Sequence, residues 1–281
     1  MESNHDGRVI RDFGNEWARY SWLNEIQLEK LRNQFIAYTY PIHNLLNERS
    51  KLVIADFGAG SGRWSYFFLP FSKKLYVLEP AKKAFEILEK RFPESTSLVL
   101  LNETITSNSI PENSLDLAVV LGVLHHLPST ERALNSISEK LKTRGTVLGY
   151  IYYSLDNRPM YYKFIWRITD LLRKTIANLP EKLKFTVCEM IALFVYLPLA
   201  RISLILSKMK VNIKHWPLSH YSNLTFKVMK NDALDRFGTR LEHRFSKEEI
   251  IKMLIAANFD KTTIVFSPNE PYWTFSAKKK S

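Results

Sequence analysis

The sequence contains a single cysteine, Cys188, among 281 residues. One cysteine cannot form an internal disulfide, and no group of cysteine and histidine residues has the spacing of a zinc site. The first six residues are polar and acidic, without the apolar segment of a signal peptide. These absences exclude a disulfide-stabilised fold and a structural zinc site, and they favour a cytoplasmic protein.

Acidic residues are fewer than basic residues. The chain contains 28 Asp and Glu and 40 Lys and Arg, which gives a net charge of +12. Such an excess is compatible with an anionic partner, either nucleic acid or a membrane surface. It is also compatible with a solvated basic surface. We slightly favour the solvated surface, because the only tight run of basic residues is 278–280.

Five short apolar segments predict the strands of a sheet. They cover residues 52–55, 75–79, 98–101, 115–121 and 146–153. Apolar residues at helical spacing predict one helix after the second strand, through residues 84–88, and another after the fourth, through residues 133–141. Strands that alternate with helices and consist almost entirely of Val, Ile and Leu are typical of a parallel sheet covered on both faces.

The pattern changes on both sides of this core, which we place at residues 49–153. Residues 1–48 predict an N-terminal helical flap, and residues 154–245 contain no clear strand and predict a helical insertion. Residues 246–281 begin with capping-box spacing and predict a last helix and a hairpin of two strands. The expected fold is an α/β domain with a Rossmann-like, seven-stranded, mostly parallel sheet and helices on both faces.

The first predicted strand runs into a glycine-rich turn, Asp56-Phe57-Gly58-Ala59-Gly60-Ser61-Gly62. Glycines let backbone N–H groups approach a ligand closely, with a helix N-terminus behind them. Dinucleotide-binding proteins have a third glycine where this chain has Arg63, and the leading Asp56 would repel a pyrophosphate. An acid there suits a ligand that carries an ammonium and a sulfonium, which favours S-adenosylmethionine over NAD. The absence of a following Gly-Lys-Ser/Thr excludes a P-loop.

Two further strand ends point to a ligand at the same edge of the sheet. Glu79 ends the second predicted strand, roughly 20 residues after the glycine turn, where an acid can accept both ribose hydroxyls of a nucleotide. Alternatively, it is a surface acid before a helix with Pro80 at its first position. The fourth strand ends at Leu121-Gly122 and is followed by His125-His126. It is expected beside the first strand, where open α/β sheets bind ligands.

These motifs resemble class I S-adenosylmethionine-dependent methyltransferases. The resemblance rests on the turn at residues 56–62, on Glu79, and on the segment from Leu115-Asp116 to Leu124-His125-His126-Leu127. It is strongest for the small-molecule branch that includes quinone-biosynthesis and sugar methyltransferases, and it covers residues 51–153 well. Residues 13–17 and 237–245 also resemble segments of bacterial methyltransferases from glycan and secondary-metabolite pathways. The sequence departs from the family at Asn102-Glu103-Thr104, where many members have a Gly-Asp that contacts the adenine amine.

The resemblance implies S-adenosyl-L-methionine as methyl donor, S-adenosyl-L-homocysteine as product, and no metal. Glu103 is the best candidate for the adenine contact, and Trp17 and Tyr20 are candidates for closing over the cofactor from the flap. The residues expected to bind the cofactor are Asp56, Phe57, Gly58, Ala59, Gly60, Gly62, Glu79, Pro80, Glu103, Leu121, Gly122 and Trp17.

The acceptor should approach the strand end that carries His125 and His126. Methyl transfer from a sulfonium mainly requires alignment and exclusion of water, and a base only if the acceptor loses a proton. Histidine titrates near neutrality and could be that base. We expect one histidine to face the site and the other to be structural, with a slight preference for His126 as the base. Tyr153 and the pair His220-Tyr221 are further candidates, as packing or binding groups.

The insertion is unusually apolar at residues 183–209, and with the nearby basic residues the segment of interest extends over 183–214. Its longest uncharged stretch, residues 190–200, is shorter than the roughly 20 residues of a spanning helix, so it is not expected to cross a membrane. Three interpretations stay open. The segment is a lid that supplies an apolar acceptor pocket, which we rank first, or a peripheral contact with an anionic membrane, or a helical pair buried against the domain or a second subunit in a homodimer.

The expected activity is methyl transfer to a small acceptor that is partly apolar or belongs to glycan or secondary metabolism. An RNA methyltransferase is one alternative, but no Asn-Pro-Pro-Tyr-type motif follows the fourth strand and no RNA-binding motif is appended, which disfavours nucleic acid. A non-catalytic module that binds the cofactor is another alternative. The intact glycine turn and Glu79 argue against it.

Overall fold

The computed structural model describes residues 4–19, 25–48, 51–93, 96–155, 160–213, 216–268 and 273–281. The chain divides into two compact units. Unit 1 consists of Met1–Asn157 and Leu241–Ser281, and unit 2 is the continuous segment Arg158–Arg240. Unit 2 lies within the predicted insertion at 154–245, whose last residues belong to unit 1.

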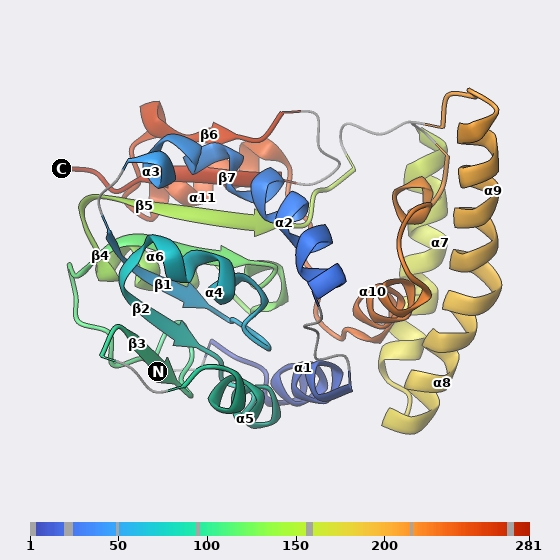
Figure 1. Cartoon of the computed structure of the whole chain (residues 1–281), viewed down its shortest axis with the longest axis horizontal. Helices are drawn as coiled ribbons and strands as arrows, with labels where there is room; N and C mark the ends of the chain where they lie inside the picture. The colour runs from blue at the N-terminus through green and yellow to red at the C-terminus, as the bar shows by residue number, and fades with distance from the viewer. Residues whose placement is uncertain are drawn as a thin grey trace. The chain divides into compact units, whose positions relative to one another are not determined.

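A seven-stranded sheet forms the centre of unit 1, in the order β3-β2-β1-β4-β5-β7-β6 (Figure 1). Strands β1 to β5 pair in parallel, whereas β7 is antiparallel to both β5 and β6. The predicted fold class is therefore confirmed, including the C-terminal hairpin. The strands are β1 (Leu52–Phe57), β2 (Ser72–Leu78), β3 (Leu98–Leu101), β4 (Leu115–Leu121), β5 (Leu141–Ile151), β6 (Val265–Phe266) and β7 (Trp273–Lys278).

Helices of unit 1 precede the sheet and connect its strands. The predicted capping box starts α11, because the Ser246 hydroxyl accepts the Glu249 N–H and the Glu249 carboxylate accepts the Ser246 N–H. The helix predicted to run through Leu141 ends at Lys140 instead, and Leu141 starts β5 with a fully buried side chain. The helices and 3-10 turns are α1 (Gly7–Arg19), α2 (Glu25–Thr39), η1 (Tyr40–Ile42), α3 (His43–Asn47), α4 (Arg63–Phe68), η2 (Leu69–Phe71), α5 (Lys82–Arg91), η3 (Leu124–His126), α6 (Thr130–Lys140), α11 (Lys247–Ala256) and η6 (Lys261–Thr263).

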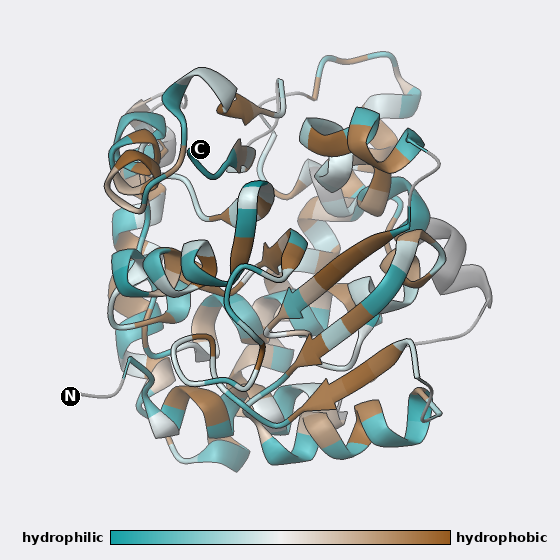
Figure 2. Ribbon diagram, turned by 90° about the vertical axis from the view of Figure 1, so that its left-hand side faces the viewer, coloured by the Kyte–Doolittle hydropathy of each residue, from teal (hydrophilic) through white to brown (hydrophobic). Residues whose placement is uncertain are grey.

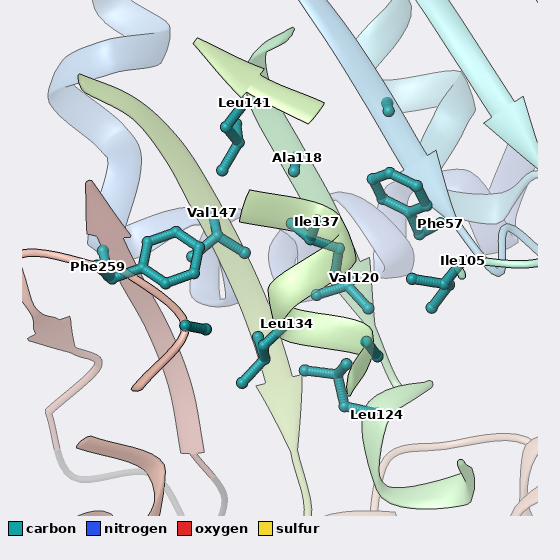
Figure 3. Packing of buried hydrophobic residues seen from close by; sticks show 14 of the residues in the cluster. Phe57, Ile105, Ala118, Val120, Leu124, Leu134, Ile137, Leu141, Val147 and Phe259 are labelled. Atoms are coloured by element: carbon teal, nitrogen blue, oxygen red, sulfur yellow. The ribbon is translucent and has the colours of Figure 1, made fainter. Parts of the chain in front are cut away.

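Each face of the sheet has its own hydrophobic cluster. On one face, Leu134 and Ile137 of α6 pack with Val120 and Val147 of the central strands (Figure 3). The other face is covered by residues of α2, α4 and α5, among them Phe35. The strands are hydrophobic over most of their length, as Figure 2 shows, because both sides of the sheet are buried. This double cover leaves the carboxyl ends of β1, β2 and β4 together at one edge.

The regular elements among the described residues of unit 2 are all helices. Its elements are α7 (Met160–Ala177), α8 (Glu181–Ile191), the π-helical turn η4 (Ala192–Tyr196), α9 (Leu197–Lys208), η5 (Ser219–Tyr221) and α10 (Phe226–Gly238). The elements α8, η4 and α9 join into one helix of 28 residues, Glu181–Lys208, visible in Figure 1. By length and composition, this helix is the one candidate for a membrane span among the described residues, contrary to the expectation from the uncharged stretch alone.

Candidate functional site

The turn after β1 requires glycine at alternate positions. Gly58, Gly60 and Gly62 have φ angles of 72°, 59° and 80°, which side chains other than glycine rarely adopt. Close neighbours reinforce this requirement. A Cβ atom on Gly60 would lie 2.5 Å from Cε2 of Trp17, and one on Gly58 would lie 2.6 Å from Cγ2 of Val123. The spacing in the sequence thus reflects both a backbone conformation and the close approach of neighbouring side chains.

Glu79 ties the glycine turn to the end of β2. One carboxylate oxygen accepts the Gly60 N–H and the other accepts the Ala81 N–H, both at 2.8 Å. The side chain is buried, so the alternative of a surface acid is wrong. Two bonds leave about half of the acceptor positions of a carboxylate available to a ligand. Glu79 is therefore placed to accept hydroxyl groups beside the glycine turn.

Asp56 is the second buried acid of the site. Its Oδ2 accepts the Ser65 hydroxyl at 2.6 Å. Burial raises the pKa of Asp56 to about 6, against the opposing effect of the Ser65 hydrogen bonds. Burial also raises the pKa of Glu79 to about 7, opposed by the two N–H groups and increased by the charge of Asp56. Neither acid forms an ion pair within the described part of the chain. A cationic ligand suits this pair.

Helix α1 crosses the edge of the sheet at this site. Before its first turn, Asn4 exchanges two hydrogen bonds of 2.9 Å with the backbone of Ser129, beyond β4. Near its other end, Asn15 accepts a bond of 2.6 Å from Lys83 of α5. Two residues after Asn15, the Trp17 ring lies against Gly60, with the Arg63 guanidinium 5.0 Å from the ring centroid. Closure of Trp17 over the cofactor stays a prediction, and Tyr20 lies outside the described residues.

The remaining candidates for cofactor binding differ in what they can offer. The side chains of Phe57, Ala59 and Leu121 belong to the hydrophobic clusters, so their backbones are the parts nearest the turn. Pro80 is half-buried after Glu79. Gly122 has a φ of 82° and its N–H donates to the Tyr150 carbonyl.

The segment after β3 contains the departure from the family pattern at Asn102-Glu103. The Asn102 amide donates to the Glu79 carbonyl at 2.7 Å and so joins the ends of β3 and β2. Glu103 uses one carboxylate oxygen, Oε2, to accept the N–H and the hydroxyl of Ser109. The contact of Glu103 with the adenine amine stays a prediction.

The two histidines after β4 have different environments. His126 is buried, and its Nδ1 lies 2.8 Å from the Leu241 carbonyl oxygen. A carbonyl only accepts, so in the neutral ring Nδ1 carries the proton and Nε2 is the nitrogen without one. The ring also contacts Phe13 of α1, at 4.9 Å between centroids.

His125 is fully buried and stacks on Tyr152 at 3.8 Å between centroids. Neither ring nitrogen has a hydrogen-bond partner among the described residues. Burial, with the nearby charges of His126, Arg244 and His243, holds the pKa of His125 well below its usual value. His125 is therefore a neutral packing group, and the expectation that His126 faces the acceptor stays a prediction.

The last candidates lie where β5 ends and in the insertion. Tyr153 pairs with Phe245, and its carbonyl accepts from Arg244 at 3.2 Å. Its neighbour Tyr152, which the sequence did not single out, contacts both histidine rings. Tyr221 is half-buried within unit 2 near Asp232, and the His220 side chain lies outside the described residues. Within unit 1, the structure brings Tyr152 to the two histidine rings.

The comparison with protein families identifies this edge of the sheet. Residues 55–149, which contain the glycine turn, Glu79 and both histidines, match the family model described as a methyltransferase domain. The chain thus contains a methyltransferase domain of the class I, S-adenosylmethionine-dependent type. Its cofactor is S-adenosylmethionine, for which the paired buried acids and the glycine turn provide a suitable site.

Known methyltransferases share this fold at low sequence identity. A protein of Anoxybacillus flavithermus described as an uncharacterized methyltransferase is 24% identical over 182 residues, which cover 63% of this chain and 82% of the relative. The 1,6-didemethyltoxoflavin-N1-methyltransferase of Burkholderia thailandensis, solved with its substrate and S-adenosylhomocysteine, has a TM-score of 0.51 at 15% identity, covering 100% of this chain and 94% of its own. Magnesium protoporphyrin IX methyltransferase of Synechocystis PCC 6803, solved with S-adenosylmethionine, has a TM-score of 0.53 at 9% identity, covering 100% of both chains.

The affinity of this methyltransferase for S-adenosylmethionine is expected to fall about tenfold between pH 8 and pH 6, because Glu79 with a pKa of about 7 becomes protonated over this range. A raised pKa in the folded state means that the free protein loses stability as the pH rises through 7, and the cationic ligand restores it there. The thermal shift produced by the cofactor should therefore be larger at pH 8. Calorimetric titration and thermal unfolding at both pH values measure this effect. A flat profile would contradict a charged Glu79 in the bound state.

Proposed function

We propose that this methyltransferase modifies a small, partly apolar acceptor at an oxygen or nitrogen that must lose a proton. The observation that carries the proposal is the hydrogen bond between His126 Nδ1 and the Leu241 carbonyl, because it fixes the ring in the tautomer whose Nε2 is basic. When bound, S-adenosylmethionine supplies a methyl group already activated by the sulfonium. What this chain must add is alignment of the acceptor, exclusion of water and removal of one proton.

The surroundings of His126 support an apolar acceptor. The rings of Phe13, His125 and Tyr152 lie around it, at centroid distances of 4.9, 4.1 and 5.7 Å. Aromatic rings offer large apolar surfaces and a preferred stacking geometry for a flat ligand. Two of the structural neighbours, named for methylating 1,6-didemethyltoxoflavin and magnesium protoporphyrin IX, are consistent with this class.

A labelling experiment tests the proposal. The protein is incubated with S-adenosylmethionine that carries a labelled methyl group and with an extract of its source cells, and label is then followed into organic-soluble, protein and RNA fractions. We expect label in the organic-soluble fraction, and none when the variant Glu79→Ala replaces the natural protein. Label that appears mainly in a ribonuclease-sensitive fraction would contradict the proposal and favour an RNA acceptor.

A further inference from the structure

Helix α7 of unit 2 turns polar side chains inward and apolar side chains outward. Arg173 is 4% exposed and donates to Asp170 at 2.8 Å and to the Thr239 carbonyl at 2.9 Å. On the opposite side of the same helix, Phe164 is 64% exposed and Leu171 is 70% exposed. A helix of a soluble domain normally has the reverse arrangement. The outward face of α7 is therefore more apolar than a solvated protein surface normally is.

The long helix Glu181–Lys208 repeats this inversion. Its inward face contains Lys184, Tyr196 and Ser203, all buried. Its outward face contains Phe194 at 65% exposure and Ile205 at 57%. Most of the large apolar side chains that the described residues expose lie between residues 160 and 211, on these two helices and the turn after them. Such a concentration marks an interaction surface, which we call the apolar face of unit 2.

Charge indicates what this face contacts. Residues 158–240 contain 15 Lys and Arg against five Asp and Glu, so most of the net charge of the chain lies in unit 2. Exposed bases such as Lys174, Lys182 and Lys208 stand near the ends of the two long helices. A second copy of the chain would bring a second strongly basic unit against the first, which is unfavourable. A bilayer with anionic lipids offers both an apolar interior and a negative surface.

Packing within unit 2 decides between lying on the bilayer and crossing it. The 28-residue helix would be about 42 Å long, more than enough to span a hydrocarbon core of about 30 Å. However, α10 packs against α7, α8 and η4, and it contributes Asp232, Asp235 and Arg236 beside Tyr196. Crossing would draw these charged groups to the middle of the bilayer, which is costly. The helix therefore fits a position in the membrane interface, with only its outward face in lipid.

We propose that unit 2 is a peripheral membrane-docking module that inserts its apolar face into anionic bilayers. The proposal is independent of the acceptor and of the cofactor site, because every residue that carries it belongs to Arg158–Arg240. Docking at a membrane would place the methyltransferase where apolar molecules concentrate.

Vesicle binding tests the proposal with the full-length protein. We expect co-sedimentation with vesicles of phosphatidylcholine and phosphatidylglycerol, at least about tenfold weaker association with phosphatidylcholine alone, and weakening by salt. The double variant Leu171→Gln/Phe194→Gln should bind the mixed vesicles at least about tenfold more weakly, because both side chains would lose their burial in lipid. The matched control is Ile36→Gln/Val265→Gln, which removes apolar residues of 60% and 44% exposure from unit 1 and should bind normally.

Two outcomes would overturn the docking proposal. One is a natural protein that binds neither kind of vesicle. The other is that the natural protein is dimeric in buffer and binds no vesicles, whereas the double variant is monomeric. This result would assign the apolar face to contact with a second copy of the chain. An equal loss of vesicle binding in the control variant would also contradict the proposal, because binding would then not depend specifically on the apolar face of unit 2.

Chemical labelling distinguishes docking from spanning. Cys188 is 1% exposed, so a cysteine introduced by Lys208→Cys, at the end of the long helix, is the reactive site. Protein expressed with membranes and recovered in sealed vesicles with unit 1 outside should react with a membrane-impermeant maleimide as fully as the unit 1 variant Glu112→Cys. Protection of Lys208→Cys alone, removed by detergent, would overturn the interfacial position and show a spanning helix.

Discussion

Replacing Glu79 with alanine is expected to raise the dissociation constant for S-adenosylmethionine at least about 100-fold. The carboxylate fixes the glycine turn by accepting the N–H groups of Gly60 and Ala81, and its remaining lone pairs are free for the ribose hydroxyls. A hydrogen bond to a charged group contributes about 1.5–3 kcal/mol, and each 1.4 kcal/mol corresponds to a factor of ten, so the loss of two such bonds accounts for the expected change. Isothermal titration calorimetry measures the dissociation constant directly.

Two further variants serve as comparisons for the dissociation constant of Glu79→Ala. Glu79→Gln keeps the size of the side chain, but its amide has a single acceptor oxygen and should lose an intermediate amount of affinity, about tenfold. Glu89→Ala removes an exposed acid from the adjacent helix α5 and should bind as the natural protein does. Thermal unfolding without ligand shows whether each variant is folded. A folded Glu79→Ala variant with normal affinity would rule out Glu79 as the ribose acceptor.

The sheet and the cofactor half of the site were predictable because they depend on local signals. Continuous apolar segments identified all five parallel strands, since a sheet covered on both faces leaves no polar alternation. The glycine turn was found for a similar reason, because a backbone with positive φ angles restricts the residue type at each position. Glu79 was found from its place at the end of the second strand. The end of α6 at Lys140 was not predictable, because an apolar residue such as Leu141 suits both a helix face and a strand.

The acceptor half of the site depends on contacts between residues that are far apart in the chain. Asn4 meets Ser129, and His126 meets Leu241, more than 100 residues away in each pair. Nothing in the sequence near His126 indicates which carbonyl fixes its ring, so the sequence could rank the two histidines only slightly. Tyr152 was missed for the same reason, because a tyrosine at the end of a strand carries no sign of the ring that it stacks on.

The long helix of unit 2 shows how a count of residues can mislead. Glu189 and Arg201 bound the longest uncharged stretch, residues 190–200, which contains Pro198 and was too short for a spanning helix. A proline inside a helix clashes with the carbonyl four residues earlier, but it is tolerated in the first turn. Here a π-helical turn at Ala192–Tyr196 precedes Pro198, so a change of helical pitch accommodates the missing N–H and the helix continues. The continuous helix makes the outward apolar face possible.

The variant His126→Asn is expected to lower methyl transfer to the acceptor by about 10²–10⁴-fold, the usual contribution of a general base. Its amide can still donate to the Leu241 carbonyl, so the connection between Leu241 and the end of β4 should persist while the lone pair of Nε2 is lost. The affinity for S-adenosylmethionine should stay within about threefold, because Glu79 and the glycine turn are unchanged. Single-turnover transfer to the acceptor found by methyl labelling, with calorimetric titration of the cofactor, separates these two effects.

His125→Phe provides the opposite expectation within the same pair of residues. The ring of His125 is fully buried and stacked on Tyr152, and neither nitrogen has a partner among the described residues. A phenyl ring keeps the stacking and removes two unsatisfied polar atoms, so stability should be equal or higher and transfer should be largely retained. The roles of the histidines would be reversed if His125→Phe abolished transfer and His126→Asn did not. Loss of transfer in both variants, with both folded and able to bind the cofactor, would instead mean that His125 contacts the acceptor directly.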